Sequence, residues 1–459
     1  MARYWNAREI IESYRLIIKG IFLKLDISIY KNRRDDLLDK IGDAVAIIFN
    51  NHHVSRNRDS EYKFRSDSYF HYFSGFPEAQ SVIFLCGGKE KKSIIFCKDK
   101  NTEYEIWNGE LHGPSKAAED YFFDESYSLE RLDEIATKLI SKFSKIFLVL
   151  DDNHSNKNRV HSWIGNNKKL KRSGSRSPEM IIDLSSIADQ MRSIKSEDEI
   201  NIMKLSGDIA SKAHIRAMKK TKPGKYEYQI EAELLYEFMQ NGALDPAYQS
   251  IVASGKNACI LHYIKNDQKL LDKDLLLIDA GCELDGYASD ITRTFPISGK
   301  FSSPQKDVYE LVLSAQLKAI DKVKPGNLFT DPHDAATDEL IRGLIDLDLC
   351  QGSFDEVRDK QLYKEFFMHR TSHWLGLDVH DAGEYTNPDS TSVKLTKNNI
   401  LTIEPGLYIR PNENIPKDFW NIGIRIEDDV CVTDSAPNIL SKMAPKSVKD
   451  IESIIGTDG

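Results

Sequence analysis

The sequence predicts an α/β domain over residues 30–183, followed by an α+β domain with an internal repeat over residues 184–459. The chain has 459 residues, which is more than one hydrophobic core usually holds. Short apolar strands alternate with helical segments from about residue 30 onward. In the second half, a pattern of strand, acid and glycine occurs twice. Residues 1–29 form an N-terminal extension to which the sequence assigns no role.

The composition is that of a globular enzyme, with 29% charged and 41% hydrophobic residues. The net charge of −9 argues against a nucleic-acid-binding protein, which usually carries a basic domain. The most apolar early stretch, residues 16–29, is interrupted by Lys19, Lys24 and Asp26, so we expect neither a membrane span nor a signal peptide. The six cysteines form no Cys-x-x-Cys pair, which predicts a reducing, cytoplasmic location.

The first domain is expected to begin with a charged helix that ends near residue 39. Residues 69–77 follow as a strongly aromatic segment. The polar stretch 151–178, which contains several basic residues, is expected to be a solvated connector to the second domain. The remaining pattern predicts a helix at 128–143 and strands at 44–49, 82–85, 93–97 and 146–150.

The second domain is expected to begin with a long helix at residues 196–220. Its first residues, Ser-Glu-Asp-Glu, have the form of a capping box. A second helix at 227–242 carries apolar residues on one face and is followed by a strand at 251–255. A third long helix is expected at 305–322, after which the pattern returns to strands.

Asp279 ends the apolar strand 275–278, and Asp290 lies just before the returning strand 291–295. We interpret the two strands as a β-hairpin. Burying an ionised carboxylate is costly unless a cation or a dense set of hydrogen bonds compensates it. Asp279 is therefore either a member of an ion pair, for which Arg293 is a candidate, or a metal ligand.

The same pattern occurs again near the C-terminus. Residues 278–281 read Ile-Asp-Ala-Gly and residues 403–406 read Ile-Glu-Pro-Gly, and each is followed by a returning strand that bears a second acid, Asp290 or Glu427. Alternation along the second returning strand places Arg425 and Glu427 on one face. The repeat predicts two related halves that each contribute two carboxylates to one site.

Residues 367–381 lie between the two halves and contain His369, His373 and His380. Four carboxylates and one neutral imidazole would balance the charge of two divalent cations. Without cations, four converging carboxylates would repel one another and raise one another's pKa values. This set of oxygen ligands with one nitrogen suits Mn²⁺, Co²⁺, Fe²⁺ or Zn²⁺.

From about residue 30 to the C-terminus the chain resembles aminopeptidase P, of the superfamily that includes creatinase, prolidase and methionine aminopeptidase. The resemblance implies a pita-bread C-terminal domain with an internal pseudo-two-fold repeat. It also implies two divalent metal ions, with Mn²⁺ the first choice, held by Asp279, Asp290, His373, Glu404 and Glu427. The motifs that carry it are Ile-Leu-His-Tyr at 260–263, Leu-Ile-Asp-Ala-Gly-Cys at 277–282, Gly-Tyr-Ala-Ser-Asp-Ile-Thr-Arg-Thr-Phe-Pro at 286–296, Ser-His-Trp-Leu-Gly-Leu-Asp-Val-His-Asp at 372–381, Thr-Ile-Glu-Pro-Gly-Leu-Tyr at 402–408 and Gly-Ile-Arg-Ile-Glu-Asp at 423–428.

The resemblance also implies roles beyond metal ligation. Glu404 is our choice for the base that takes the proton of the attacking water. The family's supporting residues correspond to His262, His369 and His380, which are expected to bind substrate or transfer protons. Arg425 and Tyr408 are expected to lie close to them. One position departs from the family pattern, since the family often has glycine directly after the position of His369. This chain has Arg370 there, a bulkier, charged side chain that would alter the entrance.

The expected activity is release of the N-terminal residue from peptides with proline in the second position. A prolidase restricted to Xaa-Pro dipeptides would share the five ligands, and a non-catalytic pita-bread binding module is a third alternative. Aminopeptidases P of this architecture form dimers or tetramers. We therefore expect a homo-oligomer, most readily a tetramer, in which Trp107 lines a proline-side pocket; we expect neither nucleic acid nor a membrane as a partner.

Overall fold

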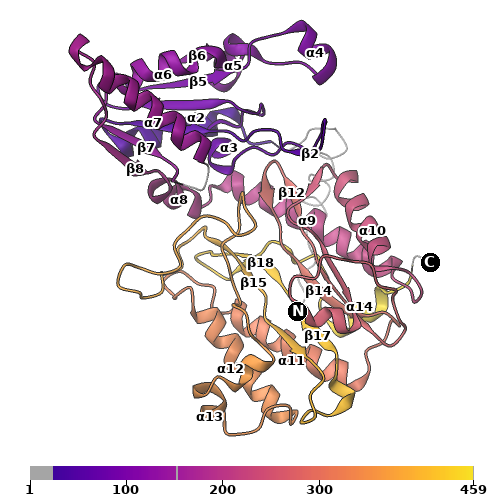
Figure 1. Ribbon diagram of the computed structural model, residues 1–459. Helices are drawn as coiled ribbons and strands as arrows, with labels where there is room; N and C mark the ends of the chain where they lie inside the picture. Colours follow the sequence, from indigo (N-terminus) through magenta and orange to yellow (C-terminus); the bar gives the residue numbers. More distant parts are fainter. Residues whose placement is uncertain (1–23, 151–153, 458–459) are drawn as a thin grey trace. The chain divides into compact units, whose positions relative to one another are not determined.

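The computed structural model describes residues 24–150 and 154–457 of the chain (Figure 1). These residues form two compact units, one spanning Leu25–Arg192 and the other beginning at Ser193. Each unit has its own sheets and its own hydrophobic core. Most of the extension at residues 1–29 lies outside the described part of the chain.

The N-terminal unit is built on one mixed six-stranded sheet with the strand order β6-β5-β4-β1-β7-β8. Strand β1 pairs antiparallel with β4 and parallel with β7. The strands are β1 (Val45–Phe49), β4 (Val82–Cys86), β5 (Lys92–Cys97), β6 (Glu125–Ser128), β7 (Lys145–Leu148) and β8 (Met180–Asp183), beside a ribbon of β2 (Ser55–Asn57) and β3 (Ser60–Glu61). The helices are α2 (Ile27–Ile41), α3 (Ser68–Ser74), α4 (Thr102–Asn108), α5 (Gly113–Tyr121), α6 (Leu132–Ile140), α7 (His154–Lys169) and α8 (Ser185–Ser193).

The expectation of a solvated connector at residues 151–178 is wrong, because residues 154–169 form helix α7. Val160 and Trp163 of this helix are buried in the core that covers the sheet. Trp163 Nε1 also donates a hydrogen bond to Asp133 at 2.7 Å. Two apolar residues three positions apart can fix a helix on a sheet, but they are too few to stand out in a polar sequence. The basic residues of the stretch are exposed, as expected: Lys168, Lys169, Lys171, Arg172 and Arg176.

The aromatic segment at residues 69–77 fills the core of its own unit. Residues 69–74 of the segment belong to α3; Phe70 and Phe73 on the helix and Phe76 just after it are fully buried. Trp107 differs from these residues because α4, on which it lies, has no buried residue. Its side chain is 82% exposed.

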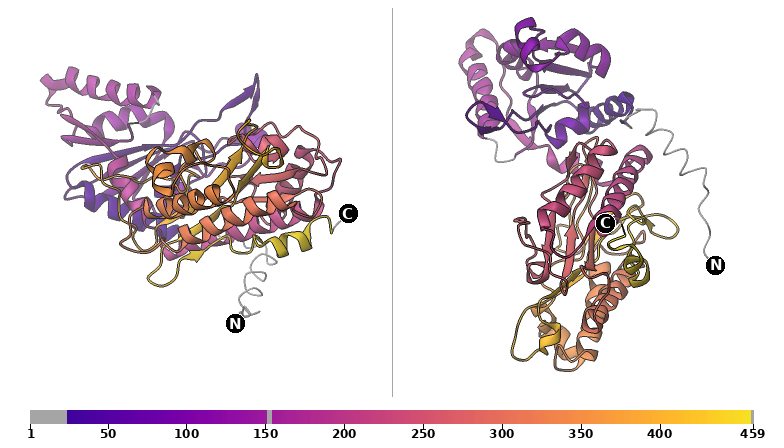
Figure 2. Two further views of the ribbon diagram at one scale, coloured as in Figure 1. Left: turned by 90° about the horizontal axis from the view of Figure 1, so that it is seen from below. Right: turned by 90° about the vertical axis from the view of Figure 1, so that its right-hand side faces the viewer.

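The C-terminal unit has long helices outside a central set of strands (Figures 1 and 2). Helix α9 packs against α10, and α11 packs against α12. The three helices expected from the sequence are confirmed within about two residues, and Ser196 caps α9 through the expected capping box with Glu199. The helices are α9 (Glu197–Lys220), α10 (Glu227–Gln240), α11 (Ser303–Ile320), α12 (Asp331–Asp346), α13 (Phe354–Asp359) and α14 (Val448–Ile454).

The strands of this unit form two sets with the same order of parts. In the first, β11 (Leu275–Asp279) pairs with β14 (Thr292–Pro296), and the short hairpin β12–β13 (Cys282–Leu284, Tyr287–Ala288) lies between them in sequence. In the second, β15 (Ile400–Ile403) pairs with β18 (Asp428–Cys431), with the hairpin β16–β17 (Gly406–Ile409, Ile422–Arg425) between them. The predicted repeat is confirmed. The simple hairpin at Asp279 is corrected, since a second hairpin makes the reversal.

The glycine after each acid allows two backbones to approach closely. A Cβ atom on Gly281 would lie 1.6 Å from the carbonyl oxygen of Ser289. One on Gly406 would lie 2.8 Å from the carbonyl oxygen of Ile424. Glycine at these positions lets each acid-bearing strand continue directly into its inserted hairpin.

The cysteines and the helices bear on the expected environment of the chain. All six cysteines are buried and free, so no disulfide links them. Within residues 24–150 and 154–457, every helix is too short or too polar to cross a membrane.

Candidate metal centre

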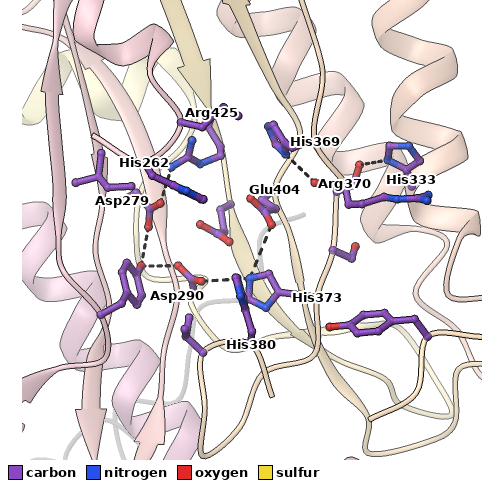
Figure 3. Close-up of a pocket in the computed structure, with 18 of the residues that line it drawn as sticks. His262, Asp279, Asp290, His333, His369, Arg370, His373, His380, Glu404 and Arg425 are labelled. Atoms are coloured by element: carbon purple, nitrogen blue, oxygen red, sulfur yellow. Dashed lines mark hydrogen bonds and ion pairs between the residues drawn. The ribbon is translucent and has the colours of Figure 1, made fainter. Parts of the chain in front are cut away.

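A pocket of about 880 Å³ lies in the C-terminal unit, where its two halves meet (Figure 3). Asp279 ends β11 and Asp290 precedes β14, while Glu404 follows β15 and Glu427 precedes β18. The two pairs therefore occupy matching places in the repeat. The register aligns them, since Asp279 pairs with Thr292 in the first half and Ile403 with Asp428 in the second half.

His373 enters the same pocket from the segment between the halves. This segment runs beside β15, because Thr402 donates a backbone hydrogen bond to His373 and Glu404 donates one to Thr371. His373 Nδ1 lies 2.9 Å from the carbonyl oxygen of Trp374 and donates to it. The lone pair of Nε2 is then free to bind a metal, 3.4 Å from Asp290 and 3.8 Å from Glu404 (Figure 3).

The acids repel one another in the absence of a cation. Burial and the charge of Asp279 raise the pKa of Asp290 well above its usual range. Burial and the charge of Asp290 do the same to the pKa of Glu427. Burial and the charge of Glu427 raise the pKa of Glu404 to about 8. A group of carboxylates that is this unfavourable by itself fits a site for cations.

The donor atoms are close enough to share a metal ion. One ligand atom from each of Asp290, His373 and Glu427 lies within 4.8 Å of the other two. Asp279 and Glu404 line the pocket beside them. Oxygen donors with one imidazole nitrogen fit a divalent first-row metal, so the residues present match the predicted type of centre.

Asp279 forms an ion pair, but with Arg425 and not with Arg293 as the sequence had suggested. Arg425 Nη2 donates to Asp279, and its Nε donates to Thr292 Oγ1 at 3.0 Å. Thr292 in turn donates to Glu427 at 2.7 Å. Arg293 pairs with Asp428 at 2.7 Å on the far side of the strands. Arg425 thus connects an acid of the first half to an acid of the second.

Arg425 also begins a chain of hydrogen bonds to His369. Arg425 Nη1 donates to the Tyr408 hydroxyl at 3.0 Å, and that hydroxyl lies 2.9 Å from His369 Nε2. His369 Nδ1 lies 2.7 Å from the carbonyl oxygen of Arg370. Because Nδ1 must donate to that carbonyl, Nε2 accepts from Tyr408. Burial and the charge of Arg425 lower the pKa of His369 to about 4, in agreement with a neutral ring.

Of the remaining predicted residues, two lie at the pocket and one does not. His262 and His380 both line the pocket. The ring of His380 lies edge-on to that of His373 at a centroid distance of 4.4 Å, and burial, with the charge of His373, lowers its pKa. Trp107 belongs to the N-terminal unit and is not among the lining residues. Its proposed role stays a prediction.

Tyr248 is a pocket residue that the sequence interpretation missed. Its hydroxyl contacts Asp279 Oδ1 at 2.7 Å and also contacts Asp290. Tyr248 lies three residues before Ile251, which pairs with Asp279 across β10 (Ile251–Ser254) and β11. The strand at 251–255 was predicted, but only its register against β11 would have revealed the contact. His333, on α12, was also missed, because only the packing of its helix brings it to the pocket.

The fold and the pocket together define a candidate metal-dependent hydrolase. Residues 201–434 match the model of metallopeptidase family M24, and residues 30–147 match the N-terminal domain of aminopeptidase P. The chain belongs to metallopeptidase family M24, with the domain arrangement of aminopeptidase P. The family that the sequence motifs indicated is thereby confirmed.

Proteins with this arrangement are similar along nearly the whole chain. The Xaa-Pro aminopeptidase of Haemophilus influenzae is 39% identical over 413 residues, which cover 90% of this chain and 93% of that protein. The structure of Pseudomonas aeruginosa aminopeptidase PepP has a TM-score of 0.93 at 40% identity, covering 94% of this chain and 98% of that chain. Zinc-substituted Escherichia coli aminopeptidase P in complex with product has a TM-score of 0.92 at 35% identity, with the same coverage. An α/β domain before a pita-bread domain, and a metal-dependent aminopeptidase, are therefore confirmed as fold and enzyme class.

Proposed function

We propose that this enzyme releases the N-terminal residue from peptides with proline in the second position. In this proposal two divalent cations are held by Asp279, Asp290, His373, Glu404 and Glu427. The observation that carries it is the convergence of four acids and one suitably oriented imidazole nitrogen in one pocket. The names of the relatives, Xaa-Pro aminopeptidase and aminopeptidase P, support the substrate class.

The protein's own groups would divide the work of hydrolysis. Divalent ions held by these residues would supply Lewis acidity, which would lower the pKa of a nearby water and polarise the carbonyl of the bond to be cleaved. We assign Glu404 to accept the proton of that water. Glu404 lines the pocket beside His373, 3.8 Å from its Nε2, and a carboxylate at that place can accept a proton from a water held between the metal ligands.

We assign different tasks to the three histidines. His262 and His380 are free to donate to the tetrahedral intermediate or to protonate the proline nitrogen as it leaves. Both ring nitrogens of His369 already have partners. We therefore assign His369 to orienting Tyr408 and, through it, Arg425, rather than to proton transfer.

We propose Mn²⁺ as the native metal, with Co²⁺, Zn²⁺ and Fe²⁺ as alternatives that fit the same donors. We further propose a cytoplasmic homo-oligomer, a dimer or a tetramer. Residues 184–459 would form its catalytic domain, and residues 30–183 would serve oligomerisation and substrate access. Trp107 would then line the proline side of a substrate pocket, which fits its exposure on α4.

Peptide length separates the proposal from the prolidase alternative. The purified enzyme, loaded with Mn²⁺, is assayed on Ala-Pro-Ala and on Ala-Pro. We expect the tripeptide to be cleaved between alanine and proline. Turnover of the dipeptide alone would favour a prolidase. A non-catalytic module is disfavoured because all five proposed ligand positions are occupied by residues able to bind metal.

A further inference from the structure

Arg370 lies in the wall of the pocket, and none of the residues that the structure describes pairs with its charge. The residue follows His369 directly and is exposed. Its carbonyl oxygen is held by His369 Nδ1, so the base of the side chain is fixed. Figure 3 shows the side chain extending toward His333 and away from Asp279 and Asp290. Within the described residues, its guanidinium has neither a hydrogen-bond acceptor nor an ion-pair partner.

Among the described residues that line the pocket, Arg370 carries the positive charge on the side away from Asp279 and Asp290. The other arginine of the lining, Arg425, is paired with Asp279. His333 lies beside Arg370, with its Nδ1 2.8 Å from Thr371 Oγ1. Burial and the charge of Arg370 lower the pKa of His333 to about 4, so this ring is neutral near pH 7. Asp334 on α12 is near enough to sense Arg370 electrostatically but is not in contact with it.

The pocket is therefore electrostatically asymmetric. The acids, which attract cations, lie on one side, and a single unpaired guanidinium lies on the other (Figure 3). A peptide is itself asymmetric, with a positive amino end and one or more carboxylates further along. Such complementarity orients a charged ligand and raises its rate of productive binding. A volume of about 880 Å³ accommodates a ligand of several residues.

We propose that Arg370 binds a carboxylate in the part of the peptide beyond proline. The inference rests on the proposed function and adds a preference to it. A planar guanidinium can hold a carboxylate through two parallel hydrogen bonds, and this geometry distinguishes it from a lysine. The carboxylate has two possible sources in a peptide substrate. One is the C-terminal group of a tripeptide and the other is an acidic side chain in the third position.

The test compares three peptides on the Mn²⁺-loaded enzyme: Ala-Pro-Ala, Ala-Pro-Ala amide and Ala-Pro-Asp amide. For a contact worth one charged hydrogen bond, we expect kcat/KM for the free acid to exceed that for the Ala-Pro-Ala amide by about five- to twentyfold, through KM. In Arg370→Gln this ratio falls to about one, and in Arg370→Lys it takes an intermediate value. A damaged fold would lower both rates and leave the ratio intact. If Ala-Pro-Asp amide shares the preference, the site also accepts a side-chain carboxylate.

The matched control is Lys364→Gln, which removes the same charge from an exposed residue that does not line the pocket but whose charge acts on the lining residue His333. We expect its acid-to-amide ratio to equal that of the wild type. An equal loss in both variants would mean a diffuse charge effect and overturn the contact. An unchanged ratio in Arg370→Gln would overturn the inference and leave the proposed function standing. A wild-type enzyme that cleaves none of the peptides would overturn both.

Discussion

Tyr248 places one hydroxyl between two acids that belong to the candidate centre. It contacts Asp279 and Asp290, and a phenol can donate its single proton to only one of them at a time. Burial and the charge of Asp279 raise the pKa of Tyr248 far above its ordinary value, so the hydroxyl stays protonated. We interpret Tyr248 as a group that orients the two carboxylates toward the metal.

Tyr248→Phe should therefore weaken metal binding. Loss of a group that orients metal ligands typically costs about 10- to 100-fold in metal affinity. Titration of the metal-free protein with Mn²⁺, followed by calorimetry, measures the change directly. Tyr385→Phe is the control, because Tyr385 lines the same pocket but bonds the backbone of Trp374 instead of an acid. Equal Mn²⁺ affinity in Tyr248→Phe and wild type would remove Tyr248 from this role.

His214 gives a prediction about pH and stability. It is fully buried on α9, and its Nε2 donates to the carbonyl oxygen of Ala280 at 3.0 Å. Burial lowers its pKa to about 4, against about 6.5 in an unfolded chain. Between these values the unfolded state binds the proton more readily, so the free energy of unfolding falls as pH falls from 6.5 to 4. The full loss is about 3 kcal/mol.

Urea unfolding at pH 7.5 and pH 5 checks this contribution. We expect His214→Gln to lose less stability between the two pH values than the wild type, because it has no imidazole to protonate. His161→Gln, at an exposed position on α7, should retain the wild-type dependence. Identical pH dependence in the wild type and His214→Gln would contradict the assignment.

Glu227 holds the loop that carries His262. This buried acid at the start of α10 accepts hydrogen bonds from Ser254 N at 2.7 Å, Tyr263 OH at 2.7 Å and Gln268 N at 2.9 Å. It thus ties both ends of the segment 254–268 to one carboxylate. A carboxylate is also favoured at a helix N-terminus. The position of His262 in the pocket therefore depends on a residue outside it.

Glu227→Gln should destabilise the enzyme and loosen this loop. The introduced amide group would face donors with a donor of its own, which costs about 1–3 kcal/mol when buried. Urea unfolding and hydrogen exchange over residues 254–268 measure the two effects. Tyr263→Phe, which removes a single hydrogen bond, should show a smaller version of both. Wild-type stability and exchange in Glu227→Gln would show that the loop is held by other contacts.

Sequence patterns predicted the elements better than their partners. The capping box at Ser196 and the periodicity of the long helices are local signals, and both were correct. The helix at 154–169 was missed because its stability comes from burial of Trp163 against a sheet formed by distant segments. The partner of Asp279 was misjudged for a related reason. Arg425 lies 146 residues away, and only the register of the strands brings it there.

The internal repeat of the C-terminal unit was the most informative feature of the sequence. Two matching strands that each end in an acid implied one shared site, and Asp279, Asp290, Glu404 and Glu427 do line one pocket. The segment between the halves drew attention to three histidines, His369, His373 and His380, and only the resemblance to aminopeptidase P picked out His373 as the ligand. Tyr248 and Thr292 carry no such mark, because a hydroxyl that supports a ligand resembles any other hydroxyl in a single sequence.

The assembly is testable by mass. We expect light scattering at micromolar concentration to report a multiple of the single-chain mass, with four chains the first expectation.

If Trp107 lines a substrate pocket, Trp107→Ala should raise KM for Ala-Pro-Ala, because the proline ring would lose its contact with the aromatic side chain. Ile106→Ala, at the neighbouring exposed position, is the control. A fully active monomer would contradict the assembly, and an unchanged KM and kcat in Trp107→Ala would contradict the pocket role.

We propose above that Asp279, Asp290, His373, Glu404 and Glu427 hold two divalent cations that support peptide hydrolysis. The most direct measurement is the metal content per chain, by elemental analysis after reconstitution with Mn²⁺, together with cleavage of Ala-Pro-Ala. We predict two ions per wild-type chain, reduced occupancy in Asp290→Asn because that acid lies between other donors, and no turnover in His373→Ala. A wild-type chain that binds no metal and shows no Mn²⁺-dependent cleavage would contradict the proposed dinuclear metal centre.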